Sequence, residues 1–275
     1  MLGKLMKHEF RATGRILLPL YLLLMVTTVF FNVMLRLTVQ PAPMSGSVVT
    51  IVTILDGVAK ASFIVSLIGT AVMTFVLMIW RFYKNLMTDE GYLMFTLPAN
   101  TDTILWSKLL TSVIWSFITL AVFAAVVAIT LVIQDANGVR EFFRDLIPFW
   151  NSLDITAGQV IGYGTEILAF AVSAVLASFL MFYAAISLGH SFSNHKILLS
   201  VVFYIVFSIA LQIVMSTAVA FGIFTFIPND LFADGDNLAL SMQLVMLLGI
   251  GINLVECIGF YVLTHCMLKR HLNLQ

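Results

Sequence analysis

Apolar residues occur along this chain in six long runs that short polar stretches separate. A helix of about 20 apolar residues crosses the hydrocarbon core of a bilayer and satisfies all its backbone hydrogen bonds internally. The pattern therefore predicts an all-α membrane protein with six transmembrane helices. The predicted spans cover about residues 16–37, 58–82, 104–134, 160–188, 197–227 and 239–268.

Composition agrees with this pattern. Of the 275 residues, 61% are hydrophobic and 10% are charged, and the mean hydropathy is +1.04. Soluble domains are about 45 to 50% apolar and about 25% charged. We therefore expect a multi-pass membrane protein in which residues 1–275 form one transmembrane domain. The formal net charge is zero and no long basic run is present, so nothing indicates a nucleic-acid partner.

Lysine and arginine positions predict the orientation of the spans. Cytoplasmic flanks of membrane helices carry an excess of these residues, and here the two sides hold ten and four. With an even number of spans, this places both termini in the cytoplasm. The ten are Lys4, Lys7, Arg11, Arg15, Arg81, Lys84, Lys108, Lys196, Lys269 and Arg270; the four are Arg36, Lys60, Arg140 and Arg144.

The first 15 residues combine basic positions with apolar ones, such as Leu2 and Phe10, near helical spacing. Such a segment is typical of an amphipathic helix in the headgroup layer; alternatively, it is a basic flank that only sets topology. The apolar run from Ile16 to Leu35 is long enough to span and no A-x-A site closes it, so we expect a retained first helix and not a cleaved signal peptide.

The polar segment between spans two and three contains an apolar cluster in "TDEGYLMFTLP", residues 88–98. Thr88 and the acids after it suit a helix start, whereas Pro98 disfavours helix at the residue before it. A short, separate amphipathic element is predicted. Its apolar side chains either enter a pocket on a soluble partner or lie against the inner membrane face.

The sequence lacks the common motifs of phosphate-binding and zinc-dependent enzymes. The sequence has no G-x-x-x-x-G-K-[ST] loop for phosphates and no H-E-x-x-H pair for zinc, so we expect no enzyme activity, cofactor or metal in this chain. Cys257 and Cys266 are nine residues apart, which suits neither a disulfide nor a metal site. His190 and His195 are expected to cap helix ends.

Polar residues inside the predicted spans are candidates for a transport path, because ionisable groups are costly in lipid. Glu256 follows Asn253 on one helical face, and Glu166 lies near an outer interface. Gln212 and Asn32 complete the set. The alternative for each is a hydrogen bond between helices. Outside the membrane, segment 135–159 carries several aromatics that we expect to anchor at the bilayer surface, or else to gate a substrate.

These features together resemble the type-2 ABC transporter permease family. The resemblance covers the whole chain in layout and is most specific in "FYKNLMTDEGYLMFTLP" (82–98) and "SKLL" (107–110), which look like small drug- or peptide-type bacterial permeases. It implies an N-terminal elbow helix over 1–15 and a cytoplasmic coupling helix over 84–95. The implied contacts with an ATPase are Lys84, Asp89, Glu90, Tyr92, Leu93 and Phe95, with a second, smaller contact at His190, Asn194 and Lys196.

The resemblance also implies partners and an activity. Two copies of a separate ABC ATP-binding subunit, which hold ATP and magnesium, would drive two permease chains, identical or similar, in the bacterial plasma membrane. The expected cargo is an amphipathic or hydrophobic peptide, drug or lipid, since the spans are rich in Phe and Met. The alternatives are a non-transporting sensor or immunity subunit that signals through its partner, and an intramembrane enzyme, which the missing motifs disfavour.

Overall fold

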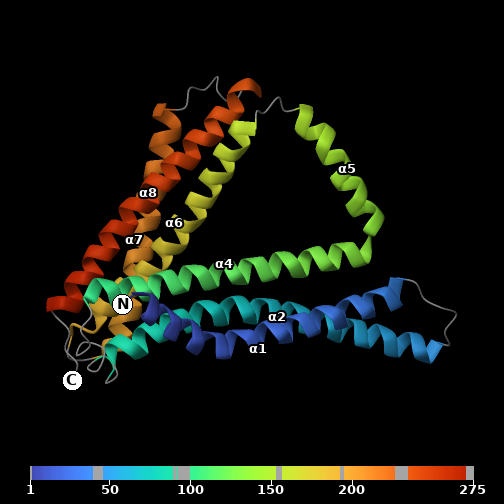
Figure 1. The fold of residues 1–275 in the computed structure, drawn as a ribbon, viewed down its shortest axis with the longest axis horizontal. Coiled ribbons are helices and arrows are strands. Elements are labelled where there is room, and N and C mark those ends of the chain that lie inside the picture. The colour runs from blue at the N-terminus through green and yellow to red at the C-terminus, as the bar shows by residue number, and fades with distance from the viewer. Residues whose placement is uncertain are drawn as a thin grey trace. The chain divides into compact units, whose positions relative to one another are not determined.

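The computed structural model describes residues 2–39, 46–88, 91, 100–152, 157–192, 195–226 and 235–270. This described part is helical and contains no strand. Six helices are long and apolar enough to cross a membrane, which confirms the six predicted apolar spans. They are α1 (Leu2–Val39), α2 (Gly46–Met87), α4 (Thr101–Gln134), α6 (Ala157–Gly189), α7 (Lys196–Phe226) and α8 (Gly235–Arg270) (Figure 1).

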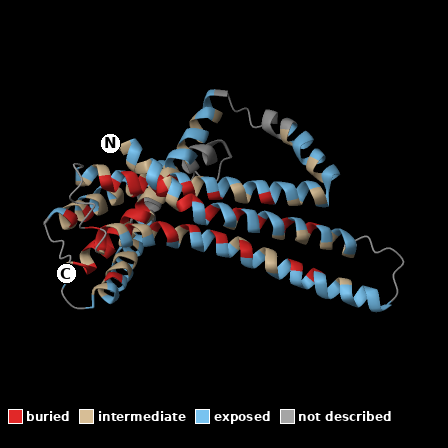
Figure 2. Cartoon of the chain, turned by 60° about the horizontal axis from the view of Figure 1, so that its bottom comes forward, coloured by how far each residue is buried: buried red, intermediate tan, exposed pale blue. Residues whose placement is uncertain are grey.

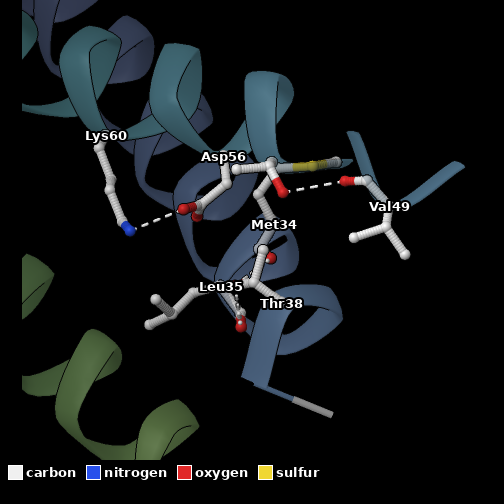
Figure 3. Close-up of polar contacts among 7 residues, drawn as sticks. Met34, Leu35, Thr38, Val49, Asp56 and Lys60 are labelled. Atoms are coloured by element: carbon white, nitrogen blue, oxygen red, sulfur yellow. Dashed lines mark hydrogen bonds and ion pairs between the residues drawn. The ribbon is translucent and has the colours of Figure 1, made fainter. Parts of the chain in front are cut away.

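Two of the helices, α1 and α2, begin more than ten residues before the predicted apolar runs. α1 is continuous from Leu2 and contains Pro19, so the structure does not show a separate elbow helix. α2 begins at Gly46 and passes through Asp56 and Lys60, whose side chains form an ion pair of 2.6 Å (Figure 3). An acid four residues before a base stabilises a helix. This pairing explains why the helix continues through two charged positions at the start of the predicted span.

An additional helix, α5 (Ala136–Ser152), occupies the segment expected to hold anchoring aromatics. Asp135 caps its start, because the Oδ1 atom of Asp135 accepts a hydrogen bond of 2.8 Å from the amide of Gly138. Phe142 and Phe143 are 64% and 62% exposed. Exposed aromatics on an amphipathic helix suit a membrane surface, and both anchoring and gating stay predictions.

The helices form two compact units. The second comprises residues 6–78 and 114–155, and polar contacts join its helices. Contacts from α1 to α4 advance in the same direction along both, so these helices run parallel. α1 and α2 run antiparallel, because Thr27 contacts Ser66 and Phe31 stacks on Phe63. The contacts are Tyr21–Thr119 (2.7 Å), Asn32–Thr130 (3.2 Å), Arg36–Ile133 carbonyl (2.9 Å), Thr27–Ser66 (2.7 Å) and Thr74–Thr119 (3.3 Å).

The first unit comprises residues 1–5, 79–113 and 156–275, and α6 packs against both α7 and α8. Its core contains the fully buried rings of Phe82, Phe179 and Tyr183. Elsewhere, large apolar side chains point outward along the helices (pale blue in Figure 2); Leu22 of α1 is 66% exposed and Val255 of α8 is 71% exposed. Such an apolar surface is unfavourable in water and favourable in lipid, in keeping with a multi-pass membrane protein.

Candidate functional site

The predicted coupling region lies mostly outside the described residues. Lys84 lies in the last turn of α2, whereas Asp89, Glu90, Tyr92, Leu93 and Phe95 are not among the residues that the structure describes. Backbone contacts fix two described residues of this segment, Thr88 and Gly91, close to the end of α2. Gly91 donates to the Thr88 carbonyl at 2.7 Å, and a Cβ at Gly91 would lie 2.6 Å from the Leu86 carbonyl oxygen. Only glycine permits the chain to pass this close to the end of α2.

The end of α2 packs against the end of α6. The rings of Phe82 and Tyr183 stack with centroids 3.8 Å apart, and the rings of Tyr83 and His190 meet edge to face at 5.3 Å. The Tyr183 hydroxyl also hydrogen-bonds Ser112 of α4 at 3.0 Å. Tyr83, the residue before Lys84, therefore contacts the turn that holds His190. The two predicted contact segments, about 100 residues apart in the sequence, start from one region of the fold.

A polar junction joins the start of α4 to the end of α8. The Tyr261 hydroxyl donates to Asp102 Oδ1 at 2.6 Å, and His265 Nδ1 lies 2.8 Å from the same oxygen. Trp106 packs on Tyr261 with ring centroids 5.7 Å apart. α4 begins directly after the coupling segment, where the carbonyl of Asn100 accepts from the first helical amides. The junction therefore connects the end of that segment to the last span.

Sequence reasoning missed this junction. Asp102, Tyr261 and His265 were not among the candidate residues that the sequence indicated. The signal that could have found it was the coincidence of one acid and two hydrogen-bonding aromatics at the same predicted membrane depth. Topology places the start of span three and the end of span six on one side, so such groups can meet there.

The turn between α6 and α7 contains His190, the first residue of the second predicted contact. His190 is only 5% exposed, and its Nδ1 donates to the Ile186 carbonyl at 2.9 Å, which confirms that it caps the end of α6. The carbonyl of His195, a residue with a φ of 55°, accepts from the Leu199 amide at the start of α7. Lys196 is the first residue of α7. Asn194 lies outside the described residues.

Burial lowers the pKa of His190 from its ordinary value of 6.5, and the positive charge of Lys196 lowers this pKa further, against the opposing effect of the Ile186 hydrogen bond. Tyr83 of α2 is the other polar ring facing it. Since protonation is disfavoured in the folded state, the unfolded chain takes up the proton first as the pH falls through 6.5. The histidine is therefore neutral in the folded protein at neutral pH.

We expect the stability of the protein to fall as the pH is lowered from 7.5 to 5.5, and the change His190→Gln to reduce this fall. Glutamine has no proton to gain, so its contribution to unfolding is the same at both values. The measurement is the thermal unfolding midpoint of the purified chain in detergent. His8→Gln, which changes an exposed histidine, is the control and should keep the full dependence. An equal fall in wild type and His190→Gln would contradict this assignment.

The polar residues within the first unit mostly pair between helices. Gln243 Nε2 donates to Glu166 Oε1 at 2.8 Å, and Asn253 Nδ2 donates to Ser173 Oγ at 3.3 Å. The second carboxylate oxygen of Glu166 is buried and has no partner among the described residues. These contacts hold α6 against α8. They favour the helix-interface interpretation for Asn253 and leave Glu166 one unpaired oxygen for a further role.

The remaining candidates differ in their surroundings. Glu256 is half-buried and Gln212 is exposed, and neither has a hydrogen bond to a described residue. Asn32, in the other unit, donates to the Thr28 carbonyl and to Thr130. Their part in a transport path stays a prediction. Cys257 and Cys266 are both free, as expected from their spacing.

Comparison with known proteins adds no relative. No family model, no curated protein and no solved structure matches the chain. Within the described part, no group of three or more His, Cys, Asp or Glu residues could hold a metal ion.

Proposed function

We propose that this chain is the membrane-spanning permease subunit of an ATP-driven exporter of the ABC type, located in a bacterial plasma membrane. Six apolar helices and the resemblance of residues 82–98 to the coupling segment of such permeases support this function. ATP hydrolysis belongs to a separate ATP-binding subunit, present in two copies. A second permease chain, identical or similar, completes the assembly.

The observation that carries the proposal is the meeting of the ends of α2 and α6. Tyr83 precedes the predicted coupling segment by one residue and contacts His190, which begins the second predicted contact. Two short polar segments that start side by side can be covered by one soluble protein. Apolar side chains of the coupling segment would fill a pocket on that protein, and charges around them would select it.

Motion of the coupling segment has a direct route into the membrane. When two ATPases close on ATP, they displace this segment, and α4 begins directly after it. Asp102 of α4 is bonded to Tyr261 and lies against His265, so displacement of α4 also acts on α8. Nucleotide can shift the spans only if the contacts differ between the inward-facing and outward-facing states. The contacts of Asp102 with Tyr261 and His265 can differ between the inward-facing and outward-facing states.

The cargo is an amphipathic or hydrophobic compound. A groove of about 490 Å³ between α7 and α8 is lined entirely by apolar residues and glycine, among them Val214, Leu247 and Val255. Sugars and ions would lose their hydration in such surroundings without gaining hydrogen bonds. A peptide, drug or lipid with an apolar portion could place that portion in the groove without losing hydration of polar groups.

Changing Tyr92 and Phe95 together to alanine is expected to abolish recovery of the ATP-binding subunit with the permease. Aromatic residues at the centre of an interface carry much of the binding energy, about 2 kcal/mol or more each. The measurement is purification of the tagged chain from its own membrane, followed by identification of a protein with a phosphate-binding loop and assay of ATP hydrolysis.

Phe142→Ala with Phe143→Ala is the matched control, because it removes two exposed aromatics from α5. It should leave recovery of the ATPase unchanged. Undiminished recovery with the Tyr92 and Phe95 changes would contradict docking at the coupling segment. A chain that never recovers an ATPase would contradict the proposed function as a whole.

A further inference from the structure

A cavity of about 700 Å³ opens where α7 begins, beside the ends of α2 and α6. Its polar side includes Tyr83, His190 and Lys196, and its other side includes Ile197, Val201 and Val202 of α7. Cavities of about 300 to 1,000 Å³ commonly hold small ligands. All three helices are membrane spans, and they begin or end here. The cavity therefore lies at the boundary between lipid and water.

His190 presents one unpaired nitrogen in this cavity. Its Nδ1 lies 2.9 Å from the Ile186 carbonyl, and a carbonyl only accepts, so Nδ1 carries the hydrogen. Nε2 is then the acceptor of a neutral ring, and it has no hydrogen-bonding partner among the described residues. The His190 side chain is 5% exposed. Because His190 lines the cavity, its Nε2 can accept a hydrogen bond from a ligand bound there.

The other residues that line the cavity favour a ligand with a charged head and an apolar tail. Lys196 contributes a positive charge at the membrane boundary, where anionic lipid headgroups are attracted by about 1 kcal/mol for each basic residue. Ile197 and Val201 are 65% and 54% exposed, so the apolar wall continues into the lipid-facing surface of α7. A ligand with a charged head and an apolar tail can enter from the bilayer without leaving it.

We propose that this cavity binds an anionic glycerophospholipid whose headgroup carries a free hydroxyl, such as phosphatidylglycerol. The phosphate lies near Lys196, a headgroup hydroxyl donates to His190 Nε2, and an acyl chain follows Ile197 and Val201. By the predicted topology the lipid comes from the cytoplasmic leaflet. This site is independent of the exporter function, since it requires neither an ATPase nor a transported substrate.

The test uses the full chain, purified in detergent and stripped of lipid, with native mass spectrometry to count bound lipids. Phosphatidylglycerol should be retained at least about fivefold more strongly than phosphatidylcholine of the same acyl chains, the factor expected from one basic contact. Lys196→Gln should lose this preference, and Lys196→Arg should restore it. Lys7→Gln, which changes an exposed lysine outside the cavity, is the matched control and should retain it.

The hydroxyl contact has its own test. His190→Phe keeps an aromatic ring against Tyr83 and removes the acceptor, so it should reduce the advantage of phosphatidylglycerol over phosphatidate while leaving both favoured over phosphatidylcholine. Soluble glycerophosphoglycerol, which lacks acyl chains, should bind far more weakly than the lipid.

Three results would overturn the proposal. One is equal retention of anionic and zwitterionic lipid by the wild-type chain. Another is a loss of preference in Lys7→Gln equal to that in Lys196→Gln. The third is unchanged lipid binding in Lys196→Gln together with loss of the ATPase on co-purification, which would assign this surface to a protein partner. Since lipid binding is measured without any ATPase, its failure leaves the exporter function untouched.

Discussion

Replacing Gly189 with alanine is expected to destabilise the first unit by about 3 kcal/mol, the upper part of the range for an overpacked contact. A Cβ at this position would lie 2.5 Å from the backbone nitrogen of Ser200 and 2.7 Å from its Cα. A backbone cannot rotate away as a side chain can. α6 and α7 would have to separate, which would also disturb the stacked rings of Phe182 and Tyr204, whose centroids are 4.1 Å apart.

Gly164→Ala provides a control within the same helix. No atom lies within 4 Å of a Cβ at Gly164, and alanine is favoured over glycine in a helix by about 1 kcal/mol. Thermal unfolding in detergent should show Gly189→Ala well below wild type and Gly164→Ala equal to it or above. Equal midpoints for the two variants would mean that the close approach of α6 and α7 is wrong.

Truncating Tyr183 to alanine is expected to cost about 3 to 5 kcal/mol, as for other large buried aromatics. The ring is fully buried and stacks on Phe82 with the planes 6° from parallel. Its hydroxyl hydrogen-bonds Ser112. The side chain thus joins α6 to α2 and α4 at one point, and its loss leaves a cavity between these helices.

Tyr183→Phe separates these contributions. It keeps the ring and removes only the hydroxyl, so it should cost about 1 kcal/mol. Combining each change with Phe82→Ala in a double-mutant cycle measures the coupling of the stacked pair, expected at about 0.5 to 1.5 kcal/mol. A cost for Tyr183→Ala no larger than that for Tyr183→Phe, in equilibrium unfolding, would contradict the packing described for this core.

The six spans were predictable because lipid leaves a long apolar segment few alternatives to a helix. Their ends were less predictable. α2 passes through Asp56 and Lys60 because the two charges pair with each other four residues apart, a local compensation that an apolar count ignores. α5 was not predicted as a helix: the sequence predicts only that aromatics in segment 135–159 anchor at the bilayer surface or gate a substrate, because the charges among them interrupt any apolar run.

Some residues of the candidate site could also be predicted from the sequence, whereas their contacts could not. Lys84, His190 and Lys196 could be proposed from charge, topology and resemblance, and the structure adds that Tyr83 and His190 touch. The Asp102–Tyr261 bond joins residues 159 positions apart, and no local pattern specifies that pairing. Glu166 was recognised as an unusual residue in a span, whereas its partner Gln243 was not.

By itself, the sequence determined that this chain crosses a membrane six times and that its charges favour one orientation, because hydropathy and charge act on each segment separately. Only the tertiary structure decided which helix ends meet, which polar groups of different helices pair, and where glycine permits backbones to touch. These outcomes depend on packing between segments far apart in the chain, and that packing is set by the shapes of several helices at once.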